Sequence, residues 1–180
     1  MQKIIISVAL AFTLMGCGSN QPKSEDADLS LRKSEAIQVY MGSCVASRAN
    51  PDSVESQVKE MGFSLLESEA AQKYLSGKPG KAWGKKTSTN SYGLTLLENS
   101  LCSVFIHKGN PKDLQASMEA WLPPANSGFT YQKNIISQRG SLTTTQYQIF
   151  RSGKLMEQWV ITTNAQVNAE LVAIMSYDGP

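Results

Sequence analysis

The amino-acid sequence predicts a single two-layer α+β domain, in which an antiparallel sheet of about five strands carries N-terminal helices and one further helix on one face. Two observations lead to this fold class. Several stretches before residue 123 have apolar residues every three or four positions, which is the spacing of amphipathic helices. After residue 128, runs rich in threonine, tyrosine and isoleucine alternate with turn residues, which is typical of a strand meander.

The first predicted helix begins near Leu31 and carries one apolar stripe. A stripe at this spacing belongs to a protein core far more often than to a binding surface, and we interpret it as core. Because the stripe includes a cysteine, the helix is expected to pack on the sheet. Its members are Ile37, Tyr40, Met41, Cys44 and Val45.

Three more helices are indicated by their start and stop signals. Asn50 followed by a proline is a typical helix start, and the helix that it begins should end near Gly62. A shorter helix is predicted over residues 67–76. Asn110, again followed by a proline, starts the last helix, and two prolines after Leu122 stop it.

Strands are predicted where apolar residues alternate with polar ones. Asn99 and Ser100 provide the turn of a hairpin between the first two strands. Residues 129–136 are a further candidate. The predicted strands are 92–96, 102–106, 142–150, 155–163 and 171–177.

Residues 78–86 form a basic stretch with two interpretations. The favoured one is a solvated connection whose Trp83 packs inward as a strand starts. The other is a patch for an anion or a partner, in which lysines supply charge and Trp83 stacks or inserts at a lipid interface. The lysines of this candidate patch are Lys78, Lys81, Lys85 and Lys86.

The N-terminus has the pattern of a secretory signal peptide. Lys3 precedes an apolar run over residues 4–15, and twelve helical residues rise roughly 18 Å, which is less than a membrane-spanning helix needs. The run ends in Leu14, Met15, Gly16 and Cys17, which resemble the lipobox of bacterial lipoproteins.

This resemblance implies that residues 1–16 are removed and that Cys17 carries a diacylglycerol. Gly18 stands where an inner-membrane retention signal would have Asp, so the resemblance favours anchoring to the outer membrane with the domain facing the periplasm. The polar residues 17–30 are then expected to be a lipidated, flexible tether. Residues 31–180 are expected to be the domain.

With Cys17 assigned to lipid, two cysteines remain. Cys44 and Cys102 are predicted to form a disulfide, because such bonds persist in an oxidising compartment. Two buried free thiols are the alternative. A zinc site is not expected, since two thiols and the lone His107 fall short of four ligands.

No catalytic motif or cofactor motif stands out, so the chain is not expected to be an enzyme or to hold a cofactor. The acidic residues are scattered over predicted caps and helix faces, and His107 lies near the end of a predicted strand. The net charge of only +2 argues against nucleic acid as a partner.

The expected function is therefore that of a non-catalytic protein-binding module in the cell envelope, such as an inhibitor or an immunity-type protein. The alternative is a structural or assembly accessory of an envelope complex. An inhibitor should present a protruding loop, for which residues 78–90 and 123–128 are the candidates. An accessory should show a broad apolar patch or an open sheet edge.

Overall fold

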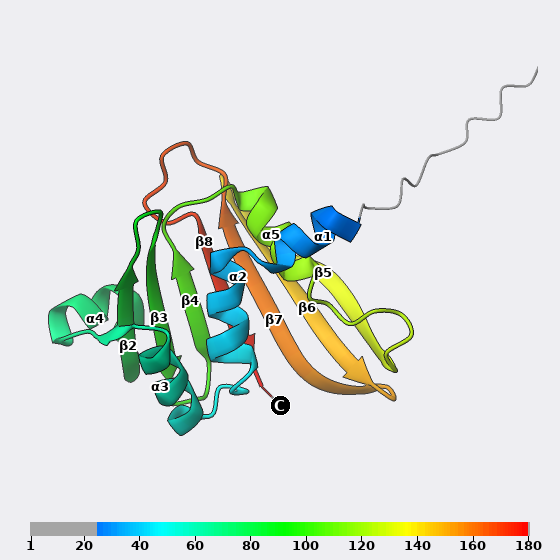
Figure 1. Ribbon diagram of the computed structural model, residues 1–180, viewed down its shortest axis with the longest axis horizontal. Coiled ribbons are helices and arrows are strands. Elements are labelled where there is room, and N and C mark those ends of the chain that lie inside the picture. Colours follow the sequence, from blue (N-terminus) through cyan, green and yellow to red (C-terminus); the bar gives the residue numbers. More distant parts are fainter. Residues whose placement is uncertain (1–24, 180) are drawn as a thin grey trace, which may run out of the picture.

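A computed structural model describes residues 25–179, which form a single α+β domain (Figure 1). The fold class is confirmed. The number of strands is not, because the antiparallel sheet has eight strands in the order β1-β2-β3-β4-β8-β7-β6-β5. The sheet is open, with β1 at one edge and β5 at the other.

The strands vary widely in length, and the shortest lies at one edge of the sheet while one of the two longest lies at the other. The two strands that sequence analysis missed are β1 and β2, and the candidate over 129–136 is confirmed as β5. The strands are β1 (Ser64–Leu65), β2 (Gly80–Lys86), β3 (Ser91–Leu97), β4 (Cys102–Ile106), β5 (Phe129–Arg139), β6 (Leu142–Arg151), β7 (Lys154–Asn164) and β8 (Ala173–Asp178).

The helices are short, and most of them lie before the middle of the chain. They are α1 (Glu25–Arg32), α2 (Glu35–Tyr40), the π-helix η1 (Met41–Val45), α3 (Pro51–Glu60), α4 (Ser68–Leu75) and α5 (Pro111–Glu119). The predicted Asn starts are confirmed. The Asn50 side chain accepts a hydrogen bond from the Ser53 amide, and that of Asn110 accepts from the Lys112 amide.

The main core lies between one face of the sheet and four helical segments. In Figure 1, α2 crosses the centre of the sheet, with α3 and α5 on either side of it. The apolar stripe of the first predicted helix faces this core as predicted: Ile37, Tyr40 and Cys44 are fully buried, and the other two members, Met41 and Val45, are partly buried against it. They pack against inward side chains of the sheet such as Val104 and Trp159.

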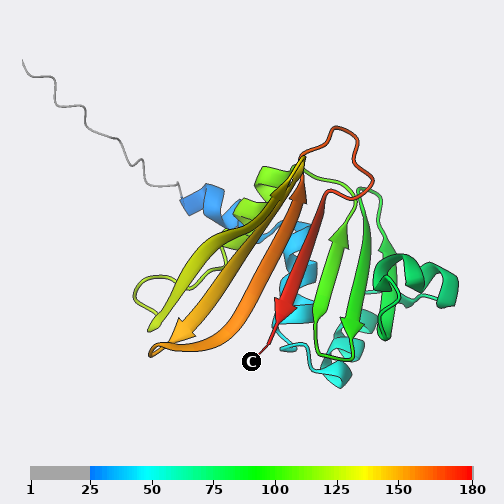
Figure 2. The ribbon, with the colours of Figure 1, turned by 180° about the vertical axis from the view of Figure 1, so that it is seen from behind.

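Helix α4 lies on the opposite face of the sheet, so the prediction that all helices share one face is wrong. Ala71 and Leu75 of α4 pack against Ala82 of β2 in a small second cluster. Gly93 on β3 explains how α4 comes so close, because a side chain there would collide with the ring of Tyr74. Figure 2 shows α4 in front of β2 and β3 at this end of the sheet.

The N-terminal helical region also differs from the predicted continuous helix. Residues 25–30, expected to be tether, belong to α1, which packs on α5. The indole N–H of Trp121 donates to the carbonyl of Arg32 and holds the end of α1 in place. The chain then continues as α2 and η1, where the Ser43 hydroxyl donates to the carbonyl of Val39.

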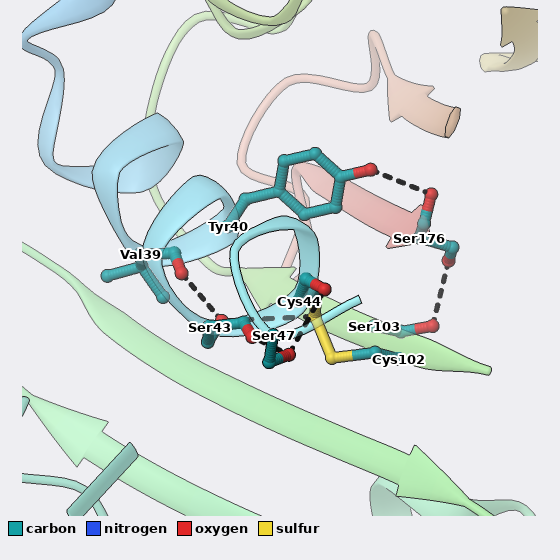
Figure 3. The surroundings of a disulfide bond; sticks show 8 residues. All are labelled: Val39, Tyr40, Ser43, Cys44, Ser47, Cys102, Ser103 and Ser176. Carbon is teal, nitrogen blue, oxygen red and sulfur yellow. Dashed lines mark hydrogen bonds between the residues drawn. A yellow bond between two sulfur atoms is a disulfide. The ribbon is translucent and has the colours of Figure 1, made fainter. Parts of the chain in front are cut away.

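The predicted disulfide between Cys44 and Cys102 is present, and both cysteines are fully buried. Figure 3 shows that it connects the helical segment η1 with β4. Beside it, the Tyr40 hydroxyl donates to the carbonyl of Ser176 on β8. The helical layer is therefore attached to two adjacent central strands, once by a covalent bond and once by a hydrogen bond.

Removing the disulfide should strongly destabilise the domain. For a sequence separation of 58 residues, the chain-entropy model predicts that the double substitution Cys44→Ala and Cys102→Ala lowers the free energy of unfolding by about 4 kcal/mol. Urea unfolding of both proteins measures this difference. Reduction of the unmodified protein should give a similar loss, and a loss below about 1 kcal/mol in both experiments would contradict the prediction.

Candidate functional site

The face of the sheet opposite the main core is uncovered from β8 to β5. Figure 2 shows α4 over β2 and β3 only, and no described helix crosses the other strands on this side. The outward side chains here are mainly uncharged amides and hydroxyls, and several of them pair across strands. Gln146 donates to Gln158 at 2.8 Å, and the hydroxyls of Thr144 and Thr162 lie 3.0 Å apart.

Strand β5 is the long open edge of this surface. It has 11 residues, and nearly all of them are exposed on both faces. Three large apolar side chains are among them: Tyr131 is 46% exposed, Ile135 63% and Ile136 54%. A register shift between Ile135 and Ser137 interrupts the pairing of β5 with β6.

Strands β5 and β6 themselves contain no acidic residues. From Ala120 to Met156 the chain contains no Asp or Glu, but it contains Lys133, Arg139, Arg151 and Lys154. Acidic side chains are frequent at the other end of the sheet, on α3 and around α4. The β5 edge is therefore a basic and partly apolar surface.

A polar network holds β5 and β6 against α5. The same carboxylate oxygen of Glu119 accepts hydrogen bonds from the Tyr147 hydroxyl at 2.6 Å and the Lys133 ammonium at 2.7 Å. The side-chain amide of Gln115 donates to it as well, at 2.9 Å. Burial by itself raises the pKa of Glu119, but these hydrogen bonds and the charge of Lys133 outweigh it and lower that pKa.

The basic stretch at residues 78–86 lies along β2 and the turn before it, with its tryptophan directed inward. Trp83 lies in the main core and is only 4% exposed, so it cannot stack on a ligand or insert into lipid. Lys81 forms an ion pair with Glu55 at 2.6 Å, and the ammonium of Lys85 lies 5.8 Å from the centre of the Phe63 ring. The remaining two lysines, Lys78 and Lys86, are exposed. The structure thus agrees with the favoured interpretation of an inward Trp83.

His107 takes part in a small cluster that sequence analysis did not identify. Its Nδ1 lies 2.8 Å from the carbonyl oxygen of Glu170, so this nitrogen carries a proton. The Nε2 lies 3.2 Å from the hydroxyl oxygen of Tyr74, within hydrogen-bond distance. Burial and the charge of Glu170 raise the pKa of Tyr74, which keeps this hydroxyl protonated.

A cavity of about 250 Å³ adjoins this cluster, and Phe105 forms part of its wall. Both ring nitrogens of His107 already have partners within the chain, and no carboxylate orients the ring toward a nucleophile. The cluster therefore lacks the base and nucleophile pairing of a hydrolase. The aromatic contacts of the cluster indicate that it packs α4 on the sheet. The ring of Tyr74 lies edge-on to that of Phe105, with 5.1 Å between the ring centroids.

The lipobox residues Leu14, Met15, Gly16 and Cys17 lie outside the described residues. Within residues 25–179, no helix is long and apolar enough to cross a membrane. No group of three or more His, Cys, Asp or Glu side chains in this part of the chain could hold a metal ion.

Comparisons with protein families, with curated proteins and with solved structures found no match to this chain. The case for a site therefore depends on sequence and geometry. The surface that the geometry favours is the uncovered face of the sheet together with its β5 edge.

The Glu119 network should make stability depend on pH. A carboxyl whose pKa is lower in the folded chain stabilises the fold above the unfolded pKa, and this contribution is lost as the pH falls through the folded pKa. Glu119→Gln should cost about 1–3 kcal/mol at pH 7 and should reduce the loss of stability on acidification. Urea unfolding of both proteins at pH 7 and at about pH 3.5 measures both effects.

Glu55→Gln is the matched control, because Glu55 forms an exposed ion pair with Lys81. It should change the free energy of unfolding by at most about 1 kcal/mol. Equal effects of the two substitutions at pH 7 would show that the Glu119 network has no special role.

Proposed function

We infer that this protein is a lipid-anchored component of the bacterial cell envelope that acts as a non-catalytic protein-binding module. The lipobox-like sequence ending at Cys17 supports the anchor and an outer-membrane location facing the periplasm. The disulfide between Cys44 and Cys102 is consistent with an oxidising compartment, although it supports the location only weakly.

The observation that carries the binding function is the unequal covering of the two sheet faces. Helices cover most of one face but leave β5 exposed on both faces, and the other face is open from β8 to β5 (Figures 1 and 2). By register with the buried side chains of β6, Tyr131 and Ile135 lie on the helix side of β5, beyond the cover that α5 provides. Open edges expose unpaired backbone groups, and natural proteins normally shorten or cover them. A long open edge with exposed Tyr131 and Ile135 therefore favours a surface that a partner covers.

Of the two binding roles considered, this surface favours the assembly or structural accessory. That role predicts an open sheet edge, and β5 has one. The inhibitor role predicts a protruding loop. Most of the candidate loop 78–90 lies in β2, with Thr87–Asn90 closing a tight connection to β3. The other candidate, 123–128, is part of an exposed connection between α5 and β5.

Affinity capture of the full-length protein from its own membranes should recover a large envelope complex. A single secreted or toxin-like protein would instead indicate the inhibitor role. Hydrolytic activity of the purified protein on envelope polymers would contradict both roles.

The anchor has a separate test in Cys17→Ser. This substitution removes the thiol that the lipid requires, so lipid labelling should be lost and the protein should leave the membrane fraction. Ser19→Ala, two residues further on, is the control and should change neither property. A Cys17→Ser protein that stays membrane-bound would show that the lipid anchor is not what holds it.

A further inference from the structure

We propose that the outer edge of β5 accepts an extended segment of a partner protein, which adds to the sheet as a ninth strand and carries acidic as well as apolar side chains. This inference rests on the proposed protein-binding function and specifies the chemistry of the partner. Three observations support it: the backbone geometry of β5, the distribution of charge around it, and the ion pair that Lys133 forms with Glu119.

The first step concerns the backbone. Strand β5 ends the sheet, so within the described chain the backbone groups on its outer side have no strand to pair with. The register shift after Ile135 leaves residues 129–135 regularly paired with β6. Seven residues are a typical strand length, enough for a peptide to add to the edge through main-chain hydrogen bonds.

The second step is that residues 129–135 of β5 lack the protection that the opposite edge has, because the register shift of β5 lies beyond them, between Ile135 and Ser137. Strand β1 has only two residues, and short edge strands are a common way to prevent unwanted pairing. A lysine on the edge strand is another common device. On β5, however, Lys133 is bonded to Glu119 on α5, which ties its ammonium to the helix side of the sheet.

The third step concerns charge. Arg139 ends β5, and Arg151 lies beside its beginning, with the guanidinium 5.3 Å from the centre of the Phe129 ring. Two arginines thus flank the docking segment, and the planar guanidinium group binds carboxylates with two parallel hydrogen bonds. Because no acidic residue occurs between Ala120 and Met156, an acidic partner segment would meet no repulsion from these two strands.

Between the two arginines, the exposed Tyr131 and Ile135 lie on the same face of β5, two positions on either side of Lys133. Cross-strand apolar pairs at such positions stabilise an added strand by roughly 0.2–1 kcal/mol each. The segment that fits is therefore extended, apolar opposite Tyr131 and Ile135, and acidic toward its ends.

Two other occupants fit less well. A second copy of β5 would bring Arg139, with Arg151 of the neighbouring β6, to both sides of the new pair, and like charges in facing strands are destabilising. A lipid surface would leave the outer backbone groups without hydrogen-bond partners, at a cost of several kcal/mol for each group buried in hydrocarbon. A protein strand satisfies both the charges and the backbone.

The test uses the full-length, lipidated protein in the cells that make it, with Tyr131 replaced by the photoreactive p-benzoylphenylalanine. The control carries the same replacement at Leu65, which is 62% exposed on the opposite edge strand β1. Illumination should crosslink position 131, but not position 65, to another protein. Mass spectrometry should place the crosslink in a segment that contains Asp or Glu.

Every other result at position 131 overturns the proposal. A covalent dimer would identify a second copy as the occupant, and a phospholipid adduct would identify the membrane. A crosslinked segment without acidic residues, equal crosslinking at position 65, or no crosslink at all would also contradict it. If affinity capture still recovers a partner in those cases, only this inference fails, and if capture recovers none, the proposed function fails with it.

A charge substitution tests the electrostatic step separately. Adding Arg139→Glu should reduce the yield of the crosslink at position 131 several-fold, because an acidic segment would then face a like charge. Lys59→Glu on α3 makes the same charge change on an exposed residue of another element and should leave the yield unchanged. An unchanged yield with Arg139→Glu would contradict the acidic partner.

Discussion

The packing of α2 and η1 on the centre of the sheet is the contact on which the rest of the structure depends. Tyr40 and Cys44 are fully buried there and attach the helical layer to β8 and β4 through a hydrogen bond and a disulfide. Because neighbouring side chains of a strand point to opposite faces, the bond to Cys102 also directs Val104 into the core and Ser103 away from it. The choice of which face becomes the core therefore follows from this one attachment.

The consequence is an asymmetric sheet. Helical segments α2, η1 and α3 cover the centre and one end of this face, and α5 extends the cover over β6 and β7 but leaves β5 exposed. After α5 the described chain forms strands and their connections only, so it has no helix to cover the far face from β8 to β5 (Figure 2). Amide and hydroxyl side chains make this face compatible with water. The exposed apolar side chains and the unpaired backbone groups lie on β5. The structure thus separates a disulfide-linked core from an open sheet edge.

Local signals in the sequence predicted much of the fold. The features that could not be predicted from the sequence depend on long-range contacts. The caps at Asn50 and Asn110, the helical stripe and the disulfide depend on short patterns or on compartment chemistry. Strand β2 was missed because Ala82 and Trp83 are buried on opposite faces, so no period-two pattern is visible. The place of α4 depends on Tyr74 fitting over Gly93, 19 positions away. The candidate site could not be predicted for a similar reason. A strand with amide side chains on its outward face has the same sequence pattern whether or not a helix covers that face. The hydrogen bond from Tyr147 to Glu119 joins residues 28 positions apart.

Amide hydrogen exchange of the full-length protein, resolved residue by residue, tests the central claim most directly. Exchange by local opening is slowest where strands are paired on both sides beneath a packed layer, and fastest at unpaired edges. The account predicts the slowest amides in β4, β8 and α2, and rapid exchange of alternate amides along residues 129–135 of β5, those that face away from β6. If all amides of β5 exchanged as slowly as those of β4, the claim that β5 is an open edge of a disulfide-linked core would be contradicted.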